Sequence, residues 1–172
     1  MKELVVTRAP RSLSVSKSEQ AFRDAFKAFE SLDLSPGLTL ERIVSAVEEI
    51  RGRRIRIKAT DRLIGTAICG LWVPGRRQEW VFHPPTPWEL QRQQFILHEL
   101  AHMVLGHDAN SAARVLLIEG LQSLPPELVR RALMRTEFRT VEEATAEYLA
   151  DLMAEALRGT PTEPGAFEEV FG

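Results

Sequence analysis

Residues 95–105 read FILHELAHMVL, an apolar run that contains two histidines and one glutamate. We expect a helix here, because the sequence TPWE at 86–89 forms a capping box with proline at the first helical position. Gly106 follows the run and is typical of a left-handed helix stop. A helix with so many apolar residues is buried, and buried histidines need a partner. The run therefore predicts a buried helix with a polar site on one face.

The motif inside this run is H-E-x-x-H, formed by His98, Glu99 and His102. Four residues at 100° per residue place the two histidines within about 40° of one helix face and about 6 Å apart along the axis. Both imidazoles can therefore reach one metal ion, and the pattern favours zinc. Glu99 lies beside the same face, where its carboxylate can accept a proton from a water molecule that the metal activates. A surface pair of polar residues explains the motif less well, because the chain has only 4 histidines.

A catalytic zinc site needs three protein ligands and an open position, so two histidines leave one ligand to be found. His107 is the nearest candidate, but it follows His98 by nine residues and would lie on the far side of the helix. Gly106 also ends the helix before it. We therefore interpret His107 as a helix-end residue that hydrogen-bonds the free carbonyl groups there.

The remaining source of a ligand is a carboxylate from another helix, as in gluzincins. The acidic sequence EEATAEYLAD at 142–151 is predicted to be helical, because a second capping box, TVEE at 140–143, opens it. Glu143 and Glu147 share one face at i, i+4, so one can bind metal while the other orients a ligand histidine. We favour Glu143 as the ligand over Glu147 and Glu142, although its place in the capping box offers a competing explanation. Small alanines beside them would let this helix approach the histidine helix closely.

The rest of the chain predicts an α+β domain that is mainly helical. Apolar residues repeat at helical spacing before the motif, and the period changes to two after Gly52, where strands are expected. Helices are predicted at 18–31 and 40–50, strands at 54–58, 63–73 and 79–83, and further short helices near 109–120 and 125–135. We expect a small three-stranded antiparallel sheet before the motif helix. Residues 18–158 would form a single metallopeptidase-like domain, with 1–17 as a flexible N-terminal arm and 159–172 as a flexible C-terminal tail.

Composition and charge exclude several function classes. The chain has 172 residues, of which 44% are hydrophobic and 27% charged, the balance of an ordinary globular domain. A net charge of -2 gives no case for direct nucleic-acid binding, and no apolar run is long enough for a membrane helix. The single cysteine, Cys69, cannot form an intrachain disulfide and is expected to be buried. We therefore expect a cytoplasmic protein.

Basic residues are concentrated at 51–77, which contain eight Arg and Lys residues and one acid, Asp61. Arg54, Arg56 and Lys58 alternate with isoleucines and would form the solvated face of the first strand. Such a face could contact nucleic acid or an acidic partner. We favour the simpler interpretation, an edge strand that its charges protect from pairing with another chain.

The motifs resemble those of the ImmA/IrrE family of bacterial zinc-dependent metallopeptidases. The similar pieces are HELAH at 98–102, LGH at 105–107 and ExxAExLA at 143–150. The resemblance implies a zincin-like, gluzincin-type fold with zinc bound by His98, His102 and Glu143. It also implies that Glu99 is the general base, and Glu147 stands where the family usually has Asn or Asp. Family members often cleave a helix-turn-helix repressor, which the resemblance offers as the partner of this chain.

The sequence thus predicts a zinc-dependent endopeptidase that hydrolyses a peptide bond in a partner protein. His83 and Tyr148 are further candidates for stabilising the oxyanion of the reaction. The main alternative is a non-catalytic, metal-bearing regulatory scaffold that acts by binding a protein through the basic strand. A direct DNA-binding regulator is a second alternative, and the net charge of -2 argues against it.

Overall fold

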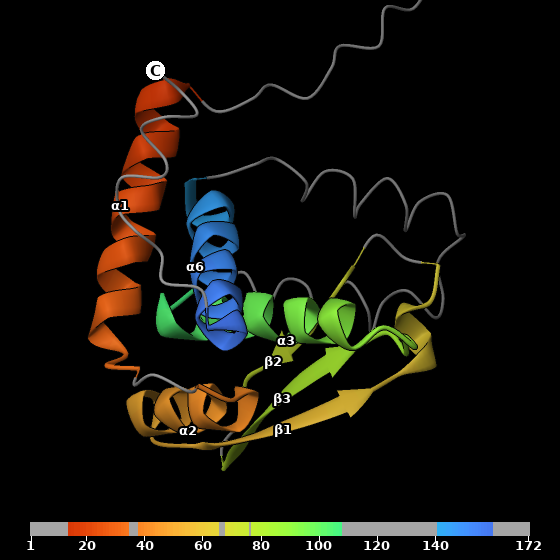
Figure 1. Ribbon diagram of the computed structural model, residues 1–172. Helices are drawn as coiled ribbons and strands as arrows, with labels where there is room; N and C mark the ends of the chain where they lie inside the picture. The colour runs from red at the N-terminus through yellow and green to blue at the C-terminus, as the bar shows by residue number, and fades with distance from the viewer. Residues whose placement is uncertain (1–13, 35–37, 66–67, 76, 108–140, 160–172) are drawn as a thin grey trace, which may run out of the picture.

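The computed structural model describes residues 14–34, 38–65, 68–75, 77–107 and 141–159 (Figure 1). Its helices are α1 Val15–Ser31, α2 Leu40–Arg51, α3 Glu89–Val104 and α6 Val141–Arg158, with a 3-10 helix, η1, at Asp61–Leu63. Its strands are β1 Arg54–Ala59, β2 Leu71–Val73 and β3 Gln78–His83. These elements confirm the predicted α+β class. The predicted helices near 109–120 and 125–135, the capping box residue Thr140, and most of the predicted arm and tail lie outside the described residues.

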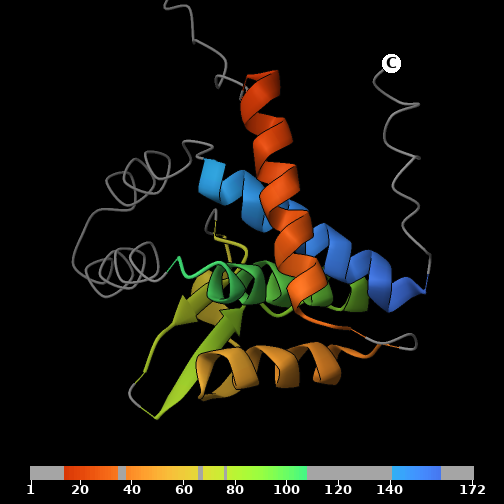
Figure 2. The same ribbon diagram turned by 90° about the vertical axis from the view of Figure 1, so that its left-hand side faces the viewer.

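Helix α3 lies at the centre of this arrangement, with α2 and the sheet on one side and α6 on the other (Figures 1 and 2). It packs against β2, β3, α2 and α6, while α1 packs against the outer side of α6. The buried residues of α3 are Ile96, Leu97, Glu99, Leu100, Ala101, His102 and Met103. The prediction of a buried helix over the histidine motif is therefore confirmed.

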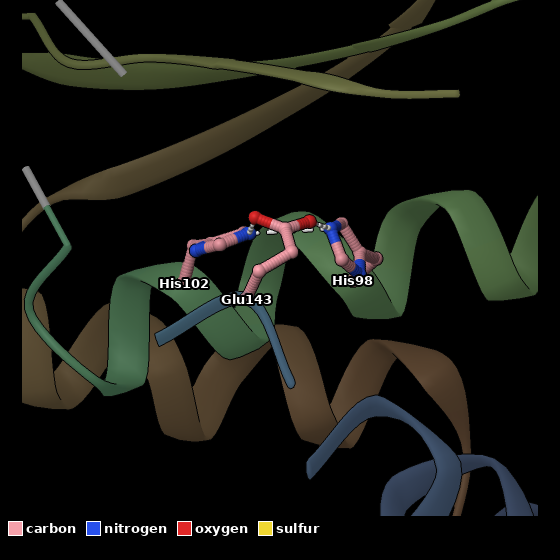
Figure 3. A group of neighbouring side chains, drawn as sticks. All are labelled: His98, His102 and Glu143. Carbon is pink, nitrogen blue, oxygen red and sulfur yellow. Dashed lines mark hydrogen bonds and ion pairs between the residues drawn. The ribbon is translucent and has the colours of Figure 1, made fainter. Parts of the chain in front are cut away.

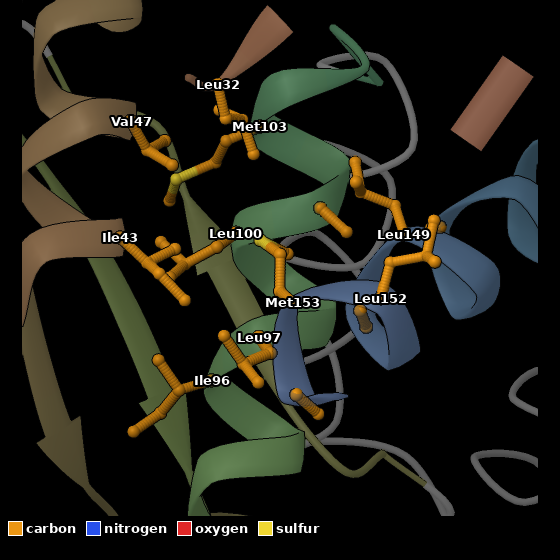
Figure 4. Close-up of a cluster of buried hydrophobic side chains, with 14 of the residues drawn as sticks. Leu32, Ile43, Val47, Ile96, Leu97, Leu100, Met103, Leu149, Leu152 and Met153 are labelled. Carbon is orange, nitrogen blue, oxygen red and sulfur yellow. The ribbon is translucent and has the colours of Figure 1, made fainter. Parts of the chain in front are cut away.

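The main hydrophobic core fills the space on both sides of α3 (Figure 4). Ile43 and Val47 of α2 approach Leu100 from one side, and Leu149 and Met153 of α6 lie on the other. All five side chains are 0% exposed. Burying each of them contributes about 1.5–3 kcal/mol, so α3 is held firmly between its neighbours. This packing fixes the direction in which the motif side chains point.

The sheet is mixed, with the strand order β1-β3-β2, so the predicted antiparallel sheet is wrong. β1 runs parallel to β3, and β2 runs antiparallel to β3. The predicted second strand, 63–73, is a strand only over Leu71–Val73, and its first residue, Leu63, belongs to η1, at whose N-cap the Thr60 side chain accepts a hydrogen bond from Arg62 N. This connection carries the chain across the sheet, and β3 then enters between β1 and β2. β1 is an edge strand, as predicted, and β2 forms the other edge, which faces α3.

The start of α3 differs from its prediction, while its end agrees. The box at 86–89 predicts Thr86 as the cap, but the helix begins at Glu89 and its N-cap is Trp88, which makes no side-chain cap bond. The Thr86 hydroxyl instead accepts the Trp88 N–H at 3.2 Å, which closes a turn before the helix. At the other end Gly106 has a φ of 70°, the left-handed conformation that was predicted for the stop.

The two long outer helices are α1 and α6. α1 begins at Val15, so 15–17 belong to the helix and not to the predicted N-terminal arm. α6 ends before Gly159, as predicted, and this glycine has a φ of 69°. In the described part of the chain no helix combines the length and the apolar character needed to cross a membrane.

Candidate metal centre

The two motif histidines lie on the same face of α3, one turn apart. Their Nε2 atoms are 3.2 Å apart, and the ring centroids are separated by 4.8 Å with the ring planes at 81°. The His98 side chain is 18% exposed and that of His102 is 3% exposed. The pair therefore presents two imidazole nitrogens to one point, with access from solvent on the His98 side.

Glu143 of α6 completes the cluster by placing its carboxylate between the two rings (Figure 3). Its Oε1 lies 3.0 Å from His98 Nε2, and its Oε2 lies 3.5 Å from His102 Nε2. The three donor atoms lie within 4.8 Å of one another. The approach depends on Ala146 and Ala150, both 0% exposed in the core, whose small side chains let α6 pack closely on α3, as the sequence predicts.

The charge state of Glu143 suits a metal ligand. Burial raises the pKa of its carboxyl, but hydrogen bonds from His102 and His98 outweigh this effect and hold the pKa well below its usual range. The group is therefore a carboxylate. Two imidazole nitrogens and one carboxylate oxygen form the donor set found in one class of catalytic zinc sites. The residues present thus fit a zinc ion in both chemistry and spacing.

His107 has a second contact that its interpretation as a helix-end residue did not include. Its backbone N–H donates to the His102 carbonyl at 3.0 Å, as expected for a helix end. Its ring also returns to the motif, with Nδ1 lying 2.9 Å from His102 Nδ1. Burial, the largest cause, lowers the pKa of His107, which favours the neutral ring, and a neutral ring can accept a hydrogen bond. The sequence feature that could have indicated this contact is Gly106, whose left-handed conformation turns the chain back toward the helix.

The other predicted site residues are not among the three that form the cluster. Glu147, predicted to orient a ligand histidine, is on α6 one turn beyond Glu143 and is not part of the cluster. The Tyr148 hydroxyl lies 2.7 Å from the Ser18 hydroxyl and so points toward α1. The His83 ring lies 2.9 Å from the carbonyl oxygen of its neighbour in sequence, close to where α3 begins. Tyr148 and His83 are therefore held by structural contacts away from the metal cluster.

Glu99 faces the sheet. It precedes His102 by three residues, which places it about 60° around the helix from that histidine. It is 1% exposed, and its Oε2 accepts a hydrogen bond of 2.8 Å from the backbone N–H of Trp72 on β2. Gly70 makes this approach possible, since a Cβ at that position would lie 2.8 Å from Glu99 Cγ and Oε1. The edge strand thereby fixes the orientation of the Glu99 carboxylate.

A buried ion-pair network supports Trp72 from the other side. Glu79 of β3 is 0% exposed, and its carboxylate accepts hydrogen bonds from Trp72 Nε1 at 2.9 Å, Arg51 at 3.0 Å and Arg53 at 3.2 Å. The Arg51 guanidinium also lies over the Trp72 ring, 4.8 Å from its centroid. Sequence reasoning counted both arginines only as part of the basic run and missed the network. The available signal was Glu79 itself, an acid at a core-facing position of an alternating strand.

Cys69 is exposed, so the prediction that it is buried is wrong. It directly precedes Gly70, in the segment that leads into β2. Gly70 then lies close to Glu99, since a Cβ at that position would be 2.8 Å from Glu99 Oε1.

Helix α3 thus carries a cluster of metal-ligand type toward α6 and a fixed carboxylate toward the sheet. Both groups sit within one five-residue motif, at 98–102. The function must be inferred from these contacts themselves. No family model, curated protein or solved structure matches the chain.

Proposed function

We propose that the protein is a zinc-dependent endopeptidase that hydrolyses a peptide bond in a partner protein. The observation that carries this proposal is the convergence of His98, His102 and Glu143, whose donor atoms lie within 4.8 Å of one another. A polar cluster of this kind next to a buried core is costly unless a bound group or proton joins its members. A divalent cation would satisfy all three donors at once.

In the proposed hydrolysis, different residues of the chain would bind the metal and transfer the proton. His98, His102 and Glu143 would hold zinc, which when bound supplies a Lewis acid for the scissile carbonyl and makes water acidic near neutral pH. Glu99 would accept a proton from the attacking water and return it to the departing amine. The Trp72 N–H holds one Glu99 oxygen at 2.8 Å, which fixes the direction of the other oxygen.

His107 would orient the ligand His102 through a hydrogen bond to the ring nitrogen that does not face the metal. A neutral His107 ring can accept the Nδ1–H of His102 across the 2.9 Å contact, which leaves His102 Nε2 as the nitrogen with a lone pair. Nε2 is also the atom that faces His98 and Glu143. Hydrogen bonds of this type orient ligand histidines in many metal sites and strengthen metal binding.

We propose further that the chain is an ImmA/IrrE-type peptidase of the cytoplasm and that its substrate is a helix-turn-helix repressor. What supports this is that the two motifs of the resemblance lie on helices that pack together, α3 and α6. The glutamate that the second motif supplies is the one that contacts both histidines.

A second candidate function is a metal-bearing scaffold that regulates a partner by binding alone. The observation that favours it is the solvated basic face of β1, on which Arg54, Arg56 and Lys58 are all exposed. In this case the metal cluster would join α3 to α6, and Glu99 would be a structural residue that binds the β2 backbone.

The substitution Glu99→Gln separates the two functions. It removes a base while keeping an oxygen that can accept the Trp72 N–H, so zinc content should be unchanged. We expect cleavage of a co-expressed repressor, or of a peptide mixture followed by mass spectrometry, to fall by about 100-fold or more. Glu89→Gln, on the exposed start of the same helix, is the matched control and should cleave normally. Full regulation of the partner by Glu99→Gln would instead establish the scaffold.

A further inference from the structure

A pocket of about 280 Å³ opens beside α3, one turn before the metal cluster. Its described lining includes Gln91 and Phe95 of α3 and, from the segment between β1 and β2, Ile64, Ile68 and Cys69. Gln91 and Phe95 precede His98 by seven and three residues, so they lie on the same stripe of the helix as the histidines. The pocket and the metal cluster therefore face the same side of α3.

The segment that contains Cys69 also connects the pocket to Glu99. Cys69 lines the pocket, and the next residue, Gly70, touches the Glu99 carboxylate. Two residues further along, the Trp72 N–H donates to the same carboxylate. Along α3, Phe95 and Glu99 are one turn apart, or about 6 Å. Both segments that line the pocket thus continue along the chain, within one helical turn or a few residues, to Glu99 or its contacts.

The lining of the pocket defines what it can hold. Among the described residues that line it, none has a charged side chain, and Gln91 and Cys69 are the two with polar side-chain groups. Its volume falls below the roughly 300–1,000 Å³ typical of pockets for whole small molecules, so it suits a single side chain. Ile64 at its rim is 60% exposed, which leaves apolar surface for an occupant to cover.

We propose that this pocket binds a large apolar side chain of the substrate peptide, such as Leu, Ile, Met or Phe, within two residues of the scissile bond. An extended peptide advances about 3.3 Å per residue, so the roughly 6 Å between Phe95 and Glu99 along the helix corresponds to about two residues of the substrate. This inference rests on the proposed peptidase function, which it extends from a reaction to a substrate class.

The first test uses the full zinc-loaded chain and a proteome-derived peptide library, with cleavage sites read by mass spectrometry. We expect one position within two residues of the cut to be strongly enriched in large apolar side chains. Ile64→Glu places a charge at the rim and should lower cleavage of those peptides by about tenfold or more relative to peptides with Lys or Arg at that position. Ile50→Glu is the control, because Ile50 is 52% exposed on α2, and it should keep the original preference.

An unselective cleavage profile, or the same apolar preference in Ile64→Glu, would overturn the assignment. Urea unfolding of both variants checks that the two exposed substitutions leave the fold intact.

The second test measures binding to the pocket without catalysis. It therefore distinguishes failure of the pocket proposal from failure of the peptidase proposal. Cys69 is the sole cysteine and is exposed, so its alkylation by iodoacetamide reports on the pocket wall. In the Glu99→Gln chain, N-acetyl-leucinamide should slow the alkylation, while N-acetyl-aspartamide at equal concentration should not. The protection should disappear in the Glu99→Gln, Ile64→Glu double variant. Equal alkylation rates with both amides would refute the pocket, whether or not the chain cleaves peptides.

Discussion

The two flanks of α3 differ in how they hold their charged side chains. Toward α6, the metal cluster stays partly open: His98 is 18% exposed and Glu143 is 34% exposed. Toward the sheet, Glu99 and Glu79 are almost completely buried, and each accepts a hydrogen bond from Trp72. A catalytic metal needs an open position for water and substrate, whereas a general base needs a fixed orientation. The difference between the flanks would suit this division of tasks in the proposed peptidase.

The largest effect should come from removing the Glu143 carboxylate on the open flank, the side of α3 that faces α6. Glu143→Ala deletes one of three donors, so zinc affinity should fall by more than the roughly 10–100-fold lost when an outer partner of a ligand is removed. Isothermal titration with zinc measures this. Glu147→Ala, one turn further along α6, is the matched control and should retain most of the affinity. A larger loss in Glu147→Ala than in Glu143→Ala would reverse the ligand assignment.

On the closed flank, the side of α3 that faces the sheet, a substitution should lower the free energy of unfolding more than it lowers zinc affinity. Glu79→Ala leaves two arginines without their buried partner, which typically costs about 3–5 kcal/mol. We expect the lower end of this range, because Arg53 is 41% exposed and water can solvate it. Urea unfolding gives the free energy, and zinc affinity of the folded protein should change little.

The control for Glu79→Ala is an ion pair at the surface. Glu89 contacts Arg92 at 3.0 Å on the first turn of α3, with side chains 59% and 36% exposed. Glu89→Ala should leave the free energy of unfolding nearly unchanged, because water screens an exposed pair. Similar losses of stability in the two variants would mean that the network around Trp72 is no more important than a surface pair.

The smallest effect should come from His107, which touches the open flank only through His102. His107→Ala should weaken zinc binding by about 10–100-fold and leave turnover at saturating zinc nearly unchanged. His107→Asn supplies a shorter side chain with an acceptor oxygen, so it should recover part of the affinity. An alanine variant with normal zinc affinity would show that the 2.9 Å ring contact has no effect on the ligand.

The open flank could be predicted from the sequence because its residues follow local rules. The i, i+4 spacing of His98 and His102 fixes their shared face, and the apolar run around them predicts burial of α3. The alanines near Glu143 predict close packing of α6. Which of Glu143 and Glu147 lies beside the histidines could not be predicted, since spacing places both on the same side of the helix, and the structure places Glu143 there.

The closed flank could not be predicted in the same way. Hydrophobic alternation shows which face of a strand is buried, but it does not show which strand lies next to which. The order β1-β3-β2 brings Glu79 beside Trp72, and the end of α2 brings Arg51 to both. These contacts join residues from separate elements whose arrangement the pattern does not encode. The contact between the His107 and His102 rings could not be predicted either, because it depends on the path of the chain after Gly106.

The position of Glu143 in the chain would give a bound metal a second physical role. His102 and Glu143 are 41 positions apart (143 minus 102), so an ion bound to both would act as a reversible cross-link. By loop-closure arithmetic, a tie across a loop of that length restricts the unfolded chain by on the order of 4 kcal/mol. α1 contacts the rest of the described fold chiefly through α6, so this tie would secure both helices. Withdrawal of zinc would then loosen the N-terminal helix as well as the centre that binds the ion.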